Sequence, residues 1–219
     1  MSEAISRRGF LKAVVTGGAA VAAGGRLGLA AITPSTRRPN VVLIITDQHH
    51  LNALSAHGCA DVHTPNLDGL VRGGFTFMQS HSTDPVCSPA RSSLFTGRMP
   101  SETGVVANEL AIRAGMPNLG EWLRQEGYQT VYAGKWHVPH SYPAQVPGFL
   151  TLRTGIGGQG NIGDAAVSRA CQGYLRQRSG TDPFFLVASF LQPHDICQFV
   201  SMHRNTPDTL PYPEIARRL

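Results

Sequence analysis

Short apolar runs alternate with amphipathic segments along the chain, and this alternation predicts a sheet with helices packed on it. VVLII (41–45) and FFLVASF (184–190) are continuous apolar runs, and YQTVYAGK (128–135) is rich in β-branched and aromatic residues. Runs of this length and composition are typical of strands. A continuous apolar run suits a strand that is buried on both faces of a parallel sheet, so we expect 41–45 to be buried in this way.

Three helices are predicted beside these strands. The segment 64–74 has Thr64 in the N-cap position, Pro65 at the first helical position and a glycine stop. The segment 118–127 also stops at glycine and places three apolar side chains on one face: Leu119, Trp122 and Leu123. The segment 164–180 repeats apolar side chains at helical spacing: Val167, Cys171, Tyr174 and Leu175. Together these elements predict an α/β fold with a mainly parallel central sheet flanked by helices.

The first 31 residues have the pattern of an export signal. Arg7 and Arg8 precede an apolar segment rich in glycine and alanine, as in a twin-arginine (Tat) signal, and a small-x-small cleavage site follows at 28–30. An amphipathic helix is disfavoured because the segment has no polar face, and its glycine content disfavours a stable membrane span. We therefore expect a Tat signal over 1–31 and a linker over 32–38. The Tat translocase is then a partner, and the destination is periplasmic or extracellular.

The composition fits one soluble globular domain. The chain has 219 residues, 42% of them hydrophobic and 15% charged, which is enough apolar material for a substantial core. Of the formal net charge of +5, three charges fall within the signal, and no basic run is interleaved with aromatic residues in the remainder. A nucleic-acid partner is therefore disfavoured.

The cysteine and glycine patterns exclude several kinds of site. The four cysteines form no CxxC pair, so a zinc site or a disulfide scaffold is disfavoured, although a single incidental disulfide stays open: Cys59, Cys87, Cys171 and Cys197. The glycine-rich segment GIGGQGNIG (155–163) lacks the context of a dinucleotide-binding loop. We expect it to be a flexible loop.

Polar side chains gather where predicted strands end or a helix begins. Parallel strands bring their carboxyl ends to one edge of the sheet, which is where α/β folds place ligand sites. The candidates form four groups: Asp47 with Gln48, Cys87 with Arg91, Lys135 with His137, and His194 with Asp195.

Cys87 has the most informative local sequence, CSPARSSLFTG (87–97). Ser88 suits an N-cap and Pro89 the first helical position, so Cys87 is expected just before a helix N-terminus. Free N–H groups and the helix dipole favour negative charge there, and Arg91 adds a cation one turn into the helix. This context favours a reactive position over a buried structural thiol.

The other groups suit a cation and an anion. Asp47 is a good ligand for a hard cation, and Gln48 offers an amide oxygen beside it, although a lone Asp after a strand is more often a cap or turn residue. Lys135 and His137 lie two residues apart in an extended segment and therefore share a face, which suits an oxyanion. His194 follows its strand in the same way.

These motifs resemble the type I sulfatases, the formylglycine-dependent branch of the alkaline phosphatase superfamily. CSPARSSLFTG resembles that family's C-x-P-x-R signature, and GYQTVYAGKWH (127–137) resembles its second signature. Three further segments match: PNVVLIITDQ, HTPNLDGLVRGGFTF and DPFFLVASFLQPHD. The resemblance spans roughly residues 39–200. It implies the alkaline-phosphatase-like α/β fold and identifies 39–219 as the N-terminal portion of a sulfatase catalytic domain.

The resemblance also implies a chemistry. In this family a formylglycine-generating enzyme converts the cysteine, here Cys87, to an aldehyde that hydrates to a diol. One hydroxyl, activated by a divalent cation (usually calcium), attacks the sulfur of a sulfate ester, and the second hydroxyl then allows sulfate to be expelled. The expected substrate is a sulfated small molecule or saccharide.

Roles follow by position from the same resemblance. The implied metal ligands are Asp47, Gln48 and residue 87 itself. Arg91 would hold the formylglycine environment together, and Lys135 and His194 would bind sulfate oxygens. His137 would orient or deprotonate the diol.

Two departures from the family pattern leave alternatives open. Many sulfatases carry a second aspartate where this chain has Gln48, and the Asp-Gln form also occurs in phosphonate and phosphate-ester hydrolases of the superfamily. The later Asp-Asn or Asp-His pair that completes the metal site has no counterpart in the 219 residues. Besides a sulfatase, a phosphonate or phosphate-ester hydrolase is therefore the second hypothesis. A truncated, inactive fragment or an anion-binding module without turnover is the third.

Overall fold

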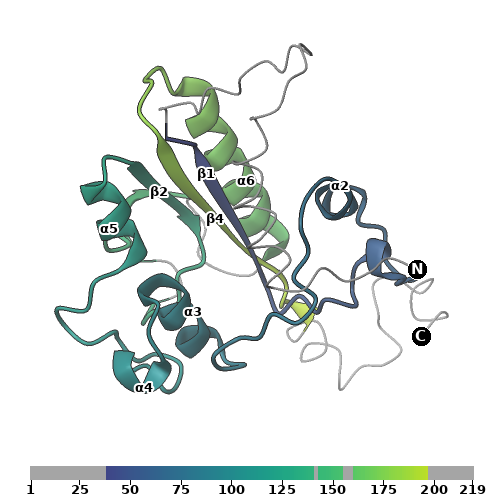
Figure 1. Ribbon diagram of the computed structural model, residues 1–219, viewed down its shortest axis with the longest axis horizontal. Coiled ribbons are helices and arrows are strands. Elements are labelled where there is room, and N and C mark those ends of the chain that lie inside the picture. Colours follow the sequence, from purple (N-terminus) through teal and green to yellow (C-terminus); the bar gives the residue numbers. More distant parts are fainter. Residues whose placement is uncertain (1–37, 141–142, 155–159, 197–219) are drawn as a thin grey trace, which may run out of the picture. The chain divides into compact units, whose positions relative to one another are not determined.

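The computed structural model describes residues 38–140, 143–154 and 160–196 (Figure 1). The predicted Tat signal, nearly all of the predicted linker, and Cys197 lie outside this part of the chain. Within it, every helix is too short or too polar to cross a bilayer. The three cysteines of the described part, Cys59, Cys87 and Cys171, are free thiols.

A four-stranded parallel sheet forms the centre of the described part. The strands are β1 (Val41–Asp47), β2 (Gln129–Gly134), β3 (Leu150–Leu152) and β4 (Phe184–Pro193). Their order is β1-β4-β2-β3, and all neighbouring pairs are parallel. The three predicted strands and the parallel α/β fold are thus confirmed. β3 was not predicted, because three residues are too few to show a periodic pattern.

Helices cover both faces of this sheet (Figure 1). Helix α6 (Gly160–Gln177) packs on one face, and α3 (Cys87–Thr96) and α5 (Leu119–Gln125) pack on the other. Side chains alternate along β4, where Phe184 and Leu186 face α6 while Phe185 and Val187 face the opposite cluster. This alternation is the period-two geometry of a strand between two apolar layers.

An aromatic cluster fills the core on the α3 side. Five rings lie within 4.9–6.0 Å of a neighbour, centroid to centroid: Phe95, Tyr132, Trp136, Phe149 and Phe185. Phe95 comes from α3, so the cluster fixes the helix that begins at Cys87 against the sheet. Edge-to-face and tilted contacts of this kind add to the burial of apolar area.

Several sequence expectations were wrong in detail. The run 41–45 was expected to be buried on both faces, but β1 is an edge strand of the described sheet, and Val42 and Ile44 are 50% and 53% exposed. Trp122 and Leu175, which the helical pattern assigned to apolar faces, are also exposed. Helix α6 begins at Gly160, so the last four residues of the predicted loop 155–163 are helical.

Three further elements complete the described part. They are the 3-10 helix η1 (Ser55–His57), α2 (Pro65–Gly73) and α4 (Pro100–Thr103). Thr64 stands in the N-cap position of α2 as predicted, but its hydroxyl donates to the Asp68 carboxylate and makes no cap hydrogen bond. The Ser55 hydroxyl also donates to Asp68. These hydrogen bonds lower the pKa of Asp68, and the one from Ser55 has the largest effect.

Gly134, the last residue of β2, allows a close approach between β2 and β4. Its φ is +100°, and a Cβ there would lie 1.9 Å from the Ser189 carbonyl oxygen. That oxygen accepts a hydrogen bond from the Lys135 amide at 3.0 Å. Because the obstructing atom belongs to the backbone, it has no rotamer by which to move away.

Gly134→Ala is expected to destabilise the fold by at least about 3 kcal/mol, through both the positive φ and the collision with Ser189. Gly173→Ala is the matched control, since the space around that helical glycine is open and alanine there should stabilise α6 by about 0.5–1 kcal/mol. Urea unfolding of both variants checks this. Equal stability of Gly134→Ala and the wild type would contradict the close approach.

Candidate active site

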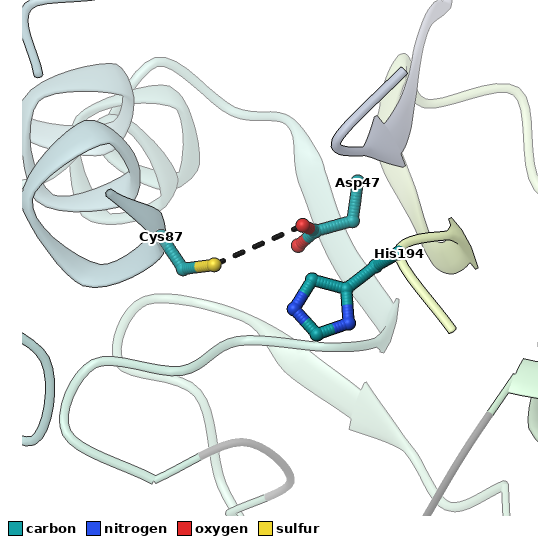
Figure 2. Close-up of side chains that lie close together, drawn as sticks. All are labelled: Asp47, Cys87 and His194. Carbon is teal, nitrogen blue, oxygen red and sulfur yellow. Dashed lines mark hydrogen bonds between the residues drawn. The ribbon is translucent and has the colours of Figure 1, made fainter. Parts of the chain in front are cut away.

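Three strands and one helix bring the predicted site residues together at the carboxyl edge of the sheet. β1 ends at Asp47, Lys135 follows β2, His194 follows β4, and Cys87 is the first residue of α3. Ligand atoms of Asp47, Cys87 and His194 lie within 4.8 Å of one another (Figure 2). The strand-end reasoning therefore placed these residues at one site correctly.

Asp47 lies between two buried cations. Its Oδ2 is 2.8 Å from the Arg91 guanidinium and 2.9 Å from the Lys135 ammonium, and all three side chains are at most 7% exposed. Burial acts to raise the pKa of Asp47, but hydrogen bonds from Lys135 and Arg91 and their positive charges together lower it. One carboxylate against two cations leaves this buried cluster with a net positive charge.

The Cys87 side chain lies on the open side of the cluster. Its thiol is 3.8 Å from Asp47 Oδ1, and its Sγ is 3.7 Å from Lys135 Nζ. Cys87 itself begins the helix, after Val86 as N-cap, so the prediction that Ser88 caps it was wrong. The Ser88 hydroxyl donates to the His137 carbonyl instead, and its amide donates to Asn108 Oδ1.

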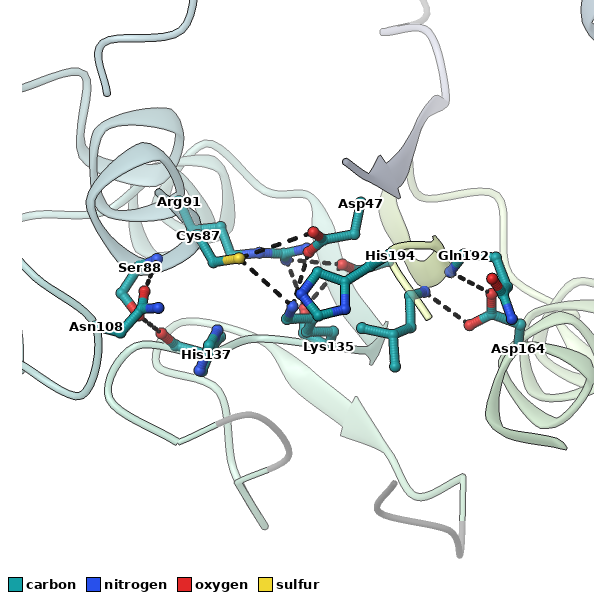
Figure 3. A network of polar contacts seen from close by, with 12 residues as sticks. Asp47, Cys87, Ser88, Arg91, Asn108, Lys135, His137, Asp164, Gln192 and His194 are labelled. Atoms are coloured by element: carbon teal, nitrogen blue, oxygen red, sulfur yellow. Dashed lines mark hydrogen bonds and ion pairs between the residues drawn. The ribbon is translucent and has the colours of Figure 1, made fainter. Parts of the chain in front are cut away.

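Arg91 connects the helix to two strands (Figure 3). Besides Asp47, its guanidinium donates to the Lys135 carbonyl at 2.7 Å and to Ser189 Oγ at 2.9 Å. The same carbonyl accepts from the Tyr132 phenol and from the Ser189 hydroxyl. Burial raises the pKa of Tyr132, so the phenol keeps its proton and remains a donor. Three donors thus fix the peptide that carries the Lys135 side chain.

The two histidines differ in their surroundings. His137 adopts φ +62°, a left-handed conformation that is uncommon for a residue with a side chain. The pKa of His137 is lowered mainly by burial and further by the positive charges of Lys135 and Arg91, so neutral imidazole is favoured. Among the described residues, Nδ1 of both His137 and His194 is buried without a hydrogen-bond partner. His194 Nδ1 lies 4.0 Å from the Asp195 carboxylate, too far for a hydrogen bond.

An open cavity of about 760 Å³ adjoins this cluster. Asp47, Gln48, Cys87 and Arg91 line it, together with residues to which the sequence assigned no role, among them His49, His50 and His81. The sequence also gave no sign of Asn108, Tyr132 or Ser189 as site residues. Tyr132 and Ser189 look like core positions of their strands, and a lone asparagine in a connecting segment carries no periodic signal.

The donor set fits an oxygen-preferring cation in part. Asp47 Oδ2 is occupied by Arg91 and Lys135, whereas Oδ1 faces only the thiol among the contacts described. Calcium takes about six to eight oxygen ligands, and Asp47 is the one carboxylate of the described three-residue group. A cation held between Asp47 and residue 87 would therefore take further ligands from outside that group.

Comparisons with known proteins agree with the sequence motifs. The family model for sulfatases matches residues 39–211. An ulvan-active sulfatase of Formosa agariphila is 40% identical over 111 residues, covering 50% of this chain and 22% of that protein. An N-acetylglucosamine-6-O-sulfatase of Bacteroides thetaiotaomicron is 32% identical over 103 residues, covering 47% and 18%. The matches thus span about a fifth of these relatives' length.

A solved structure shares the fold. The phosphonate monoester hydrolase of Agrobacterium radiobacter superposes with a TM-score of 0.60 at 25% identity, over 72% of this chain and 41% of that chain. A TM-score of this size over 72% of the chain agrees with the parallel sheet and its two helical layers.

Asp47→Asn is expected to destabilise the chain by about 3–5 kcal/mol, because it leaves Arg91 and Lys135 buried together without a counter-charge. Glu102→Gln is the matched control: it breaks an ion pair with Arg98 whose side chains are 58% and 49% exposed, and should cost less than about 1 kcal/mol. Chemical unfolding at neutral pH measures both. Similar losses in the two variants would show that the buried cluster does not depend on its carboxylate.

Proposed function

The chain belongs to the sulfatase family, and on that premise we propose that it hydrolyses sulfate esters at the site around Cys87. The observation that carries the proposal is the cluster itself. A nucleophile position at a helix N-terminus lies 3.7 Å from a buried lysine and 3.8 Å from a buried aspartate. Net positive charge beside a nucleophile suits attack on a sulfuryl group, whose oxygens carry negative charge.

Residue 87 is the proposed nucleophile. The Cys87 side chain stands where a formylglycine would form, and its sulfur marks the position of the attacking oxygen. A hydrated formylglycine would supply a hydroxyl for attack on sulfur and a second hydroxyl through which sulfate leaves. A divalent cation held by Asp47, Gln48 and residue 87, with calcium as the candidate, would polarise that hydroxyl and neutralise charge on the sulfuryl oxygens.

The cationic side chains are the proposed anion-binding groups. Lys135 Nζ reaches both Asp47 and the sulfur of Cys87, so it can donate to an oxyanion bound at residue 87. His194 approaches the same position from the end of β4. Arg91 donates to Asp47, Ser189 and the Lys135 carbonyl, so its proposed role is to hold the site together.

His137 is the proposed proton acceptor. Its lowered pKa keeps the imidazole neutral near physiological pH, and its buried Nδ1 lacks a hydrogen-bond partner among the described residues. A neutral imidazole beside cations can orient a hydroxyl and take its proton.

A sulfated saccharide is the proposed substrate class. The relatives at 40% and 32% identity are named for ulvan and for N-acetylglucosamine-6-O-sulfate chemistry. The open cavity beside Cys87, lined by His49, His50 and His81, offers polar contacts to a ligand larger than sulfate.

Phosphonate or phosphate-ester hydrolysis is a second candidate, favoured by Gln48 and by the likeness to a phosphonate monoester hydrolase. The amide gives the site less negative charge than a second aspartate would. Parallel assays with aryl sulfate and aryl phosphonate separate the two functions, and a higher kcat/KM for the phosphonate would favour the second.

We further propose that residues 1–31 direct export by the Tat pathway to a periplasmic or extracellular location, with 32–38 as linker and 39–219 as the N-terminal portion of a sulfatase catalytic domain. The twin arginine Arg7-Arg8 before an apolar segment supports this. The formylglycine-generating enzyme and the Tat translocase are the proposed maturation partners.

Expression with a formylglycine-generating enzyme should convert Cys87 to formylglycine, as peptide mass spectrometry over residues 87–91 would show. Cys87→Ala should then lower the rate of aryl sulfate hydrolysis at least about a thousandfold, because it removes the nucleophile. Cys59→Ala, a second free thiol outside the site, is the control and should keep the wild-type rate. If mass spectrometry finds only unmodified Cys87, the proposed nucleophile is wrong. Formylglycine-containing protein without turnover would favour an anion-binding module.

The pH profile of kcat/KM should have its acid limb centred below pH 6.5, the ordinary pKa of histidine, because the pKa of His137 is lowered. His137 can accept a proton only as neutral imidazole, so activity is present above its lowered pKa and is lost as the pH falls through that pKa. His137→Gln should remove this limb and reduce the rate. A midpoint at or above pH 6.5 would argue against His137 as the proton acceptor.

A further inference from the structure

Asp164, on helix α6, accepts two hydrogen bonds from the backbone of β4, just before the strand reaches His194. Its Oδ1 accepts from the Leu191 amide at 2.7 Å and its Oδ2 accepts from the Gln192 amide at 2.8 Å. Both oxygens of one carboxylate are thus used on consecutive backbone N–H groups. Hydrogen bonds to an ionised acceptor are roughly twice as strong as neutral ones.

These amides belong to the part of β4 that extends past its partner β2. The pairing of β2 with β4 ends at Gly134 and Ser189, and the last contact on that side is from the Lys135 amide to the Ser189 carbonyl. Beyond it β2 supplies no acceptor, and the register between β4 and its other partner, β1, shifts between Ile45 and Asp47. The Leu191 and Gln192 amides therefore need another acceptor, because an unpaired buried donor is costly. Asp164 supplies that acceptor from the neighbouring helix.

The chain turns immediately after the two amides. The Leu191 carbonyl accepts from the His194 amide at 3.1 Å, which closes a tight turn over residues 191–194. The position of Leu191 and Gln192 therefore determines where His194 leaves the strand. From there the His194 imidazole approaches Asp47 and Cys87, with ligand atoms within 4.8 Å.

We propose that Asp164 is a positioning residue: its carboxylate holds the backbone of Leu191 and Gln192 and thereby sets the His194 imidazole against Asp47 and Cys87. Figure 3 shows the arrangement, with Asp164 and Cys87 on opposite sides of His194. Asp164 acts through His194 and does not touch the nucleophile position. The part of this inference that concerns turnover rests on the proposed function, whereas the geometric part does not.

Asp164→Asn tests the geometric part. The amide keeps one acceptor oxygen but places an NH₂ group against the second backbone donor, so one hydrogen bond is lost. In NMR spectra of the whole chain, the hydrogen-exchange rate of the Leu191 or Gln192 amide should rise about tenfold, and the His194 ring signals should shift. Gln172→Ala is the control, since it removes a hydrogen bond to Ser168 on the exposed surface of the same helix. His194 ring signals that match the wild type in Asp164→Asn would overturn the proposal.

Measurement of kcat/KM provides a second, independent test. If Asp164 works through His194, then Asp164→Asn should lower kcat/KM in the wild type and have no further effect in a His194→Ala background. Equal effects in both backgrounds would indicate a merely structural role and overturn the proposal. If the wild type shows no turnover, the proposed function fails, and the NMR arm still decides the position of His194. Should Asp164→Asn not fold, Asp164→Glu moves the carboxylate one methylene further out and should still shift the His194 ring signals from their wild-type positions, whereas unshifted signals would overturn the proposal.

Discussion

The site depends on one buried carboxylate between two buried cations. Asp47 holds Arg91 and Lys135 at 2.8 and 2.9 Å, and each of the three side chains is almost inaccessible to water. Burying three charges is costly unless their hydrogen bonds are satisfied. Here Arg91 also donates to the Lys135 carbonyl and to Ser189, and these hydrogen bonds offset part of the free-energy cost of burying its charge. The excess of one positive charge supports the proposal that an anion binds beside Cys87.

The surrounding fold serves to bring these groups to one place. Parallel strands deliver Asp47, Lys135 and His194 to the same edge of the sheet, and the aromatic core fixes the helix that starts at Cys87. Gly134 lets β2 approach β4 closely enough for Lys135 to bond with Ser189. The proposed binding groups and the proposed nucleophile position are therefore held by the fold, which would limit the reorganisation that binding requires.

Sequence reasoning predicted that the candidate residues lie together, because its rule is topological: polar residues after parallel strands meet at one edge. It predicted Asp47, Lys135 and His194 together without any knowledge of the tertiary contacts, and the resemblance to sulfatases agreed. It failed where a contact depends on the three-dimensional neighbour. Ser88 looks like a cap in sequence, but it donates to the His137 carbonyl, 49 residues away. The apolar run of β1 indicates a strand but not its place at the edge of the described sheet, because strand order is set by partners distant in sequence.

In the proposed site, Asp47 and Arg91 hold Lys135 in place and Lys135 binds a sulfate-like anion, and calorimetric titration with inorganic sulfate tests this role. The wild-type chain should bind sulfate, and Lys135→Met should weaken binding at least about tenfold. Arg98→Met, which removes an exposed cation paired with Glu102, should leave the affinity unchanged. Equal affinity in the two variants, or no binding by the wild type, would contradict the account.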